Sequence, residues 1–167
     1  IKGKIPSAID KAYEALDKHI ADVAKKADEI IRQARTEGKN IIVLAGRPYH
    51  VDKEINHGIH KLITSLGMAV VTEQSVAPLA HTPELGVLNQ WTYHSRLYKA
   101  AQFVTTQPDM QLVQLVSFGC GVDDPAVTVM IHEHLSRIIA VQPETLLHGA
   151  LVGHPSGGSA FAAVIHR

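Results

Sequence analysis

Five apolar residues in an unbroken run, Ile41–Ala45, constrain the fold more than any other part of the chain. A run of this length without alternating polar residues is typical of a strand that is buried on both faces. The run ends at Gly46 and passes directly into a segment rich in ionisable and hydrogen-bonding side chains. Because the carboxyl ends of buried parallel strands open into the crevice where ligands bind, we expect these polar residues to serve a function.

The residues that follow predict a strand–helix–strand unit with a right-handed connection. Ile55, Ile59, Leu62, Ile63 and Leu66 share one helical face, and Gly67 ends that helix. Further along the chain we expect a strand at 68–72, a loop at 75–86, a helix at 88–101, a strand at 112–118 and a helix at 124–137. The sequence therefore predicts an α/β fold, a three-layer Rossmann-like or flavodoxin-like domain with a mainly parallel sheet, over residues 1–137. Residues 138–167 form a tail of weak periodicity, for which the two alternatives are a short strand with a loop and a poorly ordered segment.

A long helix is expected before the first strand, over residues 7–37, with Ser7 as its N-cap and Gly38 as its stop. Its apolar positions alternate in steps of four and three residues: Ile9, Tyr13, Leu16, Ile20, Val23, Ala27, Ile30 and Ala34. This narrow stripe has two interpretations, a helix that covers the sheet or a coiled-coil seam to a partner. The short run and its alanines favour the covering helix.

Composition excludes several classes of function. The chain has 16 basic and 16 acidic residues, so its charge gives no reason to expect a nucleic-acid or membrane partner. No apolar stretch approaches the roughly 20 residues of a membrane span. A single cysteine excludes an internal disulfide and fits a reducing cytoplasm. Because the chain begins at Ile1, we expect it to be a piece of a longer protein.

The segment after the first strand, Gly46-Arg47-Pro48-Tyr49-His50, is neither a dinucleotide-binding glycine loop nor a phosphate-binding P-loop. Arg47 suits an anionic oxygen of a carboxylate or phosphate, because its guanidinium can donate two parallel hydrogen bonds. The candidate ligand-binding or cofactor-binding residues are Arg47, Tyr49, His50, Asp52, Asn56 and His57. The alternative is structural: Arg47, Asp52 and Glu54 bond to one another and only shape the turn.

Histidine and cysteine spacing offers candidates for metal chemistry. His57 and His60 are expected about one turn apart on a helix, which can hold a metal, but a solvated or capping role is favoured because no third ligand is apparent. The pair His132 and His134 points in different directions. Cys120 lies between two glycines just after a predicted strand, where a thiolate could ligate iron or act as a nucleophile with His50 as its base. A small buried side chain at a tight turn is the alternative, and one sulfur cannot hold an iron–sulfur cluster alone.

Three stretches resemble a known family. Ala45-Gly-Arg-Pro-Tyr-His-Val-Asp-Lys-Glu-Ile-Asn-His-Gly-Ile59 resembles a signature segment of the large activator-type proteins related to 2-hydroxyacyl-CoA dehydratases, the CoA-substrate-specific enzyme activases. Leu88-Asn-Gln-Trp-Thr-Tyr-His-Ser-Arg96 and Leu112-Val-Gln-Leu-Val-Ser-Phe-Gly-Cys-Gly-Val-Asp123 are similar to later parts of their dehydratase-subunit-like region. The resemblance runs over about residues 5–123, and nothing is carried over to the residues beyond it.

The resemblance implies a module of an ATP-driven, low-potential electron-transfer system in anaerobic prokaryotes. Its expected partners are the ATPase activator domains of the parent protein or a dehydratase or reductase component, and an acyl-CoA is an expected ligand. Cys120 would match a cysteine at a [4Fe–4S] cluster completed by ligands outside this chain. ATP is not expected to bind this piece, and we do not expect the piece alone to be an active enzyme. A non-catalytic domain that docks an acyl-CoA-like ligand or a partner is the alternative.

Overall fold

The computed structural model describes residues 4–81, 91–115 and 138–141. Cys120, His132, His134 and the helix expected at 124–137 lie outside the described residues. The strands are β1 (Ile41–Ala45), β2 (Ala69–Thr72), β3 (Met110–Leu115) and β4 (Ile138–Val141). The helices are α1 (Ile5–Thr36), α2 (Pro48–Val51), α3 (Ile59–Ser65), α4 (Glu73–Val76) and α5 (Thr92–Thr105), with a 3₁₀ turn, η2 (Ala77–Leu79).

The four strands form one sheet in the order β2-β1-β3-β4, and every described pair is parallel. Val43 in the middle of β1 lies opposite Val71 of β2 and Leu112 of β3. All five residues of β1 are buried, as its unbroken apolar run predicts. The order β2-β1-β3-β4 is that of a flavodoxin-like sheet, and the predicted α/β fold is confirmed.

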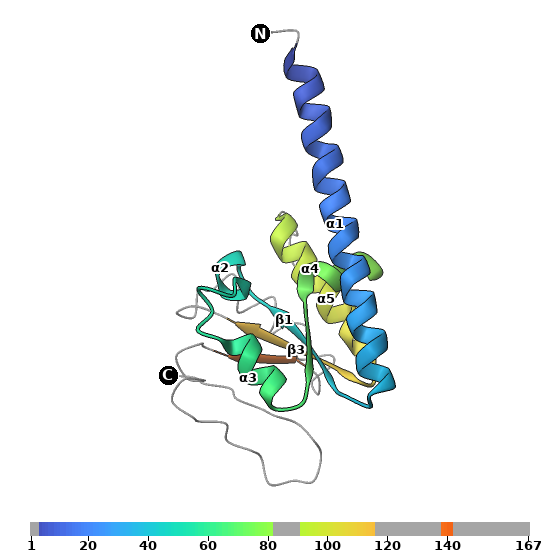
Figure 1. Cartoon of the computed structure of the whole chain (residues 1–167), viewed down its shortest axis with the longest axis vertical. Helices are drawn as coiled ribbons and strands as arrows, with labels where there is room; N and C mark the ends of the chain where they lie inside the picture. Colours follow the sequence, from blue (N-terminus) through green and yellow to red (C-terminus); the bar gives the residue numbers. More distant parts are fainter. Residues whose placement is uncertain (1–3, 82–90, 116–137, 142–167) are drawn as a thin grey trace.

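Helices cover both faces of the sheet (Figure 1). Side chains of β1 alternate between the two faces, because successive residues of a strand point to opposite sides. Ile42 and Leu44 pack with Ile59 and Ile63 of α3. Ile41, Val43 and Ala45 pack on the other face in a core shared with α1, α4 and α5. The three layers expected from the sequence are therefore α3, the sheet, and the group of α1, α4 and α5.

Helix α1 begins two residues earlier than predicted, and Ser7 lies inside it rather than at its N-cap. Pro6 is tolerated there because the first helical amides have no partner within the helix. The end of the helix is as predicted. Gly38 has φ +65°, its N–H donates to the carbonyl of Arg35, and the N–H of Lys39 donates to that of Ala34, the hydrogen bonds of a Schellman motif.

Several boundaries after β1 differ from the sequence prediction. Helix α5 begins at Thr92 rather than at residue 88, and β3 begins at Met110 rather than at residue 112. Two further differences have a clear local cause. Ile55 is not part of the helix that precedes β2, because His57 and Gly58 have φ values of +54° and +79°, and α3 begins only at Ile59. The expected loop from Ser75 onward begins instead as α4 and η2. Pro78 does not prevent this, because it lies in the first positions of η2, where its missing N–H breaks no hydrogen bond.

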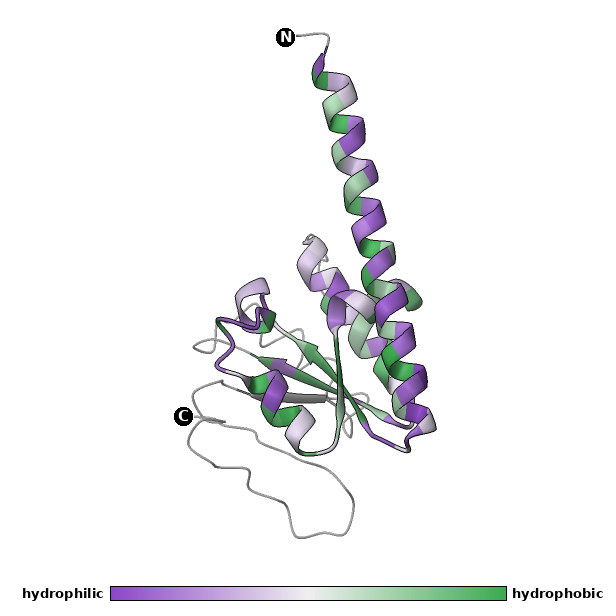
Figure 2. Ribbon diagram, viewed as in Figure 1, coloured by the Kyte–Doolittle hydropathy of each residue, from purple (hydrophilic) through white to green (hydrophobic). Residues whose placement is uncertain are grey.

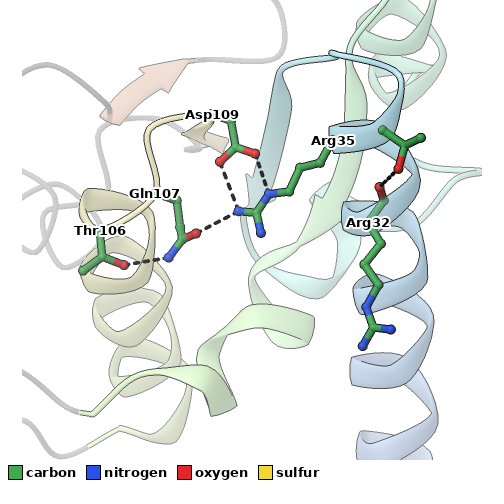
Figure 3. A network of polar contacts seen from close by, with 6 residues as sticks. Arg32, Arg35, Thr106, Gln107 and Asp109 are labelled. Atoms are coloured by element: carbon green, nitrogen blue, oxygen red, sulfur yellow. Dashed lines mark hydrogen bonds and ion pairs between the residues drawn. The ribbon is translucent and has the colours of Figure 1, made fainter.

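The carboxyl-terminal end of α1 is fixed to the turn between α5 and β3 (Figure 3). The Arg35 guanidinium donates to both carboxylate oxygens of Asp109, over 2.7 and 3.1 Å, and to the Gln107 side-chain oxygen over 2.8 Å. Ala27, Ile31 and Ala34 are buried against the body of the fold, whereas the N-terminal half of the helix extends away from it (Figure 1). The covering-helix interpretation thus holds for the second half of α1.

Candidate functional site

A tight turn at the carboxyl end of β1 builds the centre of the candidate site. The backbone N–H of Arg47 donates to Nδ1 of His50 over 3.2 Å, and the N–H of His50 donates to the carbonyl of Arg47 over 2.8 Å. Because Nδ1 accepts, the neutral His50 ring carries its proton on Nε2 and can donate from there. A Cβ at Gly46 would lie 2.7 Å from the Cβ of His50, so only glycine lets the buried imidazole sit against the strand end.

Topology places this turn where α/β proteins bind ligands. β1 lies between β2 and β3, and the connections that leave β1 and β2 pack on opposite faces, through α3 and α5. The strand that follows β1 along the chain, β2, lies on one side of β1, and the strand that follows β3 in the described residues, β4, lies on the far side of β3, so the strand order reverses between β1 and β3, which is a topological switch point. Arg47 and His50 come directly after β1 at this point, as the sequence predicts.

Three residues that were not predicted as site residues are linked to Arg47 through a series of contacts. Its guanidinium carbon is 6.0 Å from the centre of the Tyr93 ring, and that of Arg96 is 5.7 Å from the same ring centre. Both separations are within the range of cation–π attraction. The Arg96 guanidinium in turn donates to Oε1 of Glu73 over 3.0 and 3.1 Å. We call Arg47, Glu73, Tyr93 and Arg96 the two-arginine cluster.

Glu73 is the most deeply buried charged residue of this cluster, with 2% of its side chain exposed. Burial raises the pKa of the Glu73 carboxyl above its usual range, and the nearby Arg96 opposes this rise without cancelling it. Its second oxygen, Oε2, is buried and has no hydrogen-bond partner among the described residues. The sequence signal for Glu73 was its place directly after the last residue of β2, the same position that Gly46 has after β1.

The other predicted site residues form the loop between α2 and α3. Oδ1 of Asp52 accepts the backbone N–H groups of Glu54 and Ile55 over 2.9 and 3.2 Å, so this carboxylate shapes the turn. Oδ1 of the buried Asn56 accepts the N–H of Gly58 and lies 3.1 Å from Nδ1 of His60. Nδ2 of Asn56 is buried without a hydrogen-bond partner in the described part of the chain.

Tyr49 and His57 differ in how they relate to the site. The Tyr49 ring is half exposed, and its centre lies 4.3 Å from that of the His50 ring. His57 is exposed and precedes α3, so the expectation that His57 and His60 share one face of a helix is wrong. The positive φ of His57 is the physical reason, because a left-handed residue cannot continue a right-handed helix.

The described residues contain neither a cluster of metal ligands nor a membrane-spanning helix. Within residues 4–81, 91–115 and 138–141, no three His, Cys, Asp or Glu side chains are grouped so that they could hold a metal ion. Cys120, the predicted metal ligand, lies outside these ranges. No helix in the described part of the chain is long and apolar enough to cross a membrane.

Fold and site together define a doubly wound α/β domain with a polar cluster at the carboxyl edge of its sheet. Residues 2–76 match the family described as the CoA enzyme activase uncharacterised domain. The resemblance to CoA enzyme activases is thus confirmed over α1, β1, β2 and the segments between them, and the chain contains an activase-related domain. Neither the curated proteins nor the solved structures gave a significant match.

Proposed function

We propose that this chain is the ligand-binding domain of a CoA enzyme activase-type system and holds an anionic, acyl-CoA-like ligand at the carboxyl edge of its sheet. The observation that carries the proposal is the position of Arg47 at the switch point between β1 and β3, beside a second guanidinium on the same tyrosine ring. Two cations at one edge favour an anion such as a phosphate or carboxylate. The family match over residues 2–76 supports a CoA ester as the source of that anion.

The proposal assigns separate tasks to the residues of the site. Arg47 donates to the anionic group, and His50 holds the turn that places Arg47. Tyr93 keeps both guanidinium groups at the sheet edge through its ring face, and Glu73 orients Arg96. No bond is made or broken in these tasks, so the domain binds and positions its ligand without itself catalysing a reaction.

Isothermal titration with CoA, acetyl-CoA and a 2-hydroxyacyl-CoA tests this function. Binding should weaken at least tenfold in Arg47→Ala, because a charge-assisted hydrogen-bond pair is lost. Arg32→Ala is the matched control, since Arg32 is an exposed arginine of α1 paired with Asp28, and it should bind like the unchanged protein. Absence of binding, or equal affinity in both variants, would remove the proposal.

An electron-transfer role is the second candidate, with Cys120 as one ligand of an iron–sulfur cluster. The parallel register of β1 and β3, with Ala45 opposite Gln114, favours it, because the chain leaves β3 at the same sheet edge as Gly46. The residues of this chain do not fit a complete cluster, since it has one cysteine and clusters need several thiolates. The role therefore depends on ligands from other segments of an ATP-driven activase system.

Anaerobic reconstitution of the full-length parent protein with iron and sulfide tests this second role. It predicts a sulfur-to-iron charge-transfer absorption that is reduced by Cys120→Ser. Failure of the full-length protein to take up iron, or an unchanged spectrum in the variant, would count against it.

A further inference from the structure

The N-terminal half of α1 carries a row of large apolar side chains in contact with solvent. Ile9, Tyr13 and Leu16 are 48%, 64% and 50% exposed. They follow the alternating four- and three-residue spacing that leads through Ile20 to the buried Ala27. Figure 2 shows apolar bands continuing along the part of α1 that extends beyond the body of the fold. Single exposed apolar residues are ordinary, but a row at heptad spacing is typical of the seam of a helix pair.

The charges beside this row are unequal on its two sides. Asp10 and Asp17 each follow a seam residue by one position and line one flank, whereas Ala12 and His19 line the other. On the opposite side of the helix stands a column of basic residues seven positions apart: Lys4, Lys11, Lys18, Lys25 and Arg32. The apolar seam therefore has one acidic flank, and the column of basic residues lies on the side of the helix that faces away from the seam.

The charges beside the seam and the position of the sheet disfavour two simple partners for the seam, a second copy of this chain and a membrane surface. In an antiparallel pair of identical helices, Ile9 would face Ile20 and Tyr13 would face Leu16, which brings Asp10 close to Asp17 of the second copy twice. In a parallel pair, the second copy would bring its own sheet to the side where Ala27 and Ala34 already pack. A membrane surface is disfavoured because Asp10 and Asp17, directly beside the apolar row, would meet anionic lipid head groups at the depth where the row inserts.

We propose that the N-terminal half of α1 is a docking site for an amphipathic helix of a partner protein, with lysine or arginine side chains on the flank that meets Asp10 and Asp17. The two helices pack as a short coiled coil, and the ion pairs select the partner. Docking also adds packing contacts to a helical segment whose apolar side chains are exposed to solvent in the structure. This inference goes beyond ligand binding at Arg47.

Fluorescence anisotropy with two labelled three-heptad peptides tests the site on the whole chain. Both peptides carry the same leucine and isoleucine seam, and one has lysine and the other glutamate at the flanking positions. The chain should bind the lysine peptide about five- to tenfold more tightly, and added salt should reduce the difference. Tyr13→Gln/Leu16→Gln should abolish binding of both peptides while circular dichroism shows the helix retained.

Reversing the charges beside the seam tests whether the peptide preference comes from Asp10 and Asp17 or from the overall charge of the helix. Asp10→Lys/Asp17→Lys should reverse the preference between the two peptides. Glu14→Lys/Asp22→Lys is the matched control, because it makes the same change of charge away from the seam, and it should keep the lysine preference. The proposal is overturned if the peptides bind equally or not at all, if the chain sediments as a dimer through α1, or if it binds anionic vesicles.

Discussion

Replacing Gly46 by alanine should disrupt the turn that holds Arg47, and the structure sets the size of the effect. The new Cβ would meet the Cβ of His50 at 2.7 Å and its Nδ1 at 3.1 Å, so the buried imidazole has to move. Overpacking of a filled site costs about 1–3 kcal/mol. Loss of the hydrogen bond from Arg47 N–H to His50 adds about 1 kcal/mol. We expect Gly46→Ala to lower the free energy of unfolding by about 2–4 kcal/mol.

Urea denaturation followed by circular dichroism measures this loss as a fall of about 1–2 M in the midpoint. Gly67→Ala is the control: its Cβ would meet nothing within 4 Å, so only its φ of +81° should cost stability, about 1 kcal/mol. If the clash with the Cβ of His50 causes the loss, Gly46→Ala should stay costly in a His50→Ala background, which keeps that Cβ. The same change should become nearly neutral in a His50→Gly background, which removes it. A midpoint for Gly46→Ala equal to that of the unchanged protein would refute the reasoning.

Three further substitutions test other contacts. Asp109→Ala should lower the free energy of unfolding by about 1 kcal/mol. This is near the upper end for a partly exposed ion pair, because Arg35 donates two hydrogen bonds to the Asp109 carboxylate. A double-mutant cycle with Arg35→Ala that shows no coupling energy would contradict this. Burial raises the Glu73 pKa, so the folded state favours the neutral carboxyl. The contribution of this group to the free energy of unfolding is therefore complete below about pH 4.5, the usual pKa, and is lost as the pH rises through the raised pKa. As the pH rises through this range, Glu73→Gln should therefore become more stable relative to the unchanged protein. Denaturation at several pH values measures this difference, and parallel pH profiles of the two proteins would exclude a raised Glu73 pKa. Asn56→Ala should cost about 1–2 kcal/mol, because Gly58 N–H loses its acceptor, and thermal unfolding with no shift in midpoint would show the bond to be unimportant.

How much the sequence predicts depends on whether the signal is local. The β1 bounds agree with the sequence prediction because an unbroken apolar run and a following glycine mark both ends. The sequence prediction starts α3 too early: Gly58, with φ +79°, was the local signal for a break, whereas the positive φ of His57 beside it is uncommon for a residue with a side chain. The position of Arg47 and His50 at the sheet edge could be predicted because both follow a strand directly. The contact of Glu73 with Arg96 was not, because it spans 23 positions and exists only once α5 packs beside the end of β2.

The two-arginine cluster also bears on where the function resides. Arg47 and Glu73 lie within the segment that matches the activase family, whereas Tyr93 and Arg96 belong to α5, beyond that segment. The ring that both guanidinium groups approach is therefore supplied by the unmatched part of the chain. If Tyr93→Leu and Arg96→Ala weaken CoA-ester binding to the extent proposed for Arg47→Ala, the matched segment alone cannot form the site. The domain that evolved to bind the ligand must then include α5, and its natural boundary lies after the family match ends.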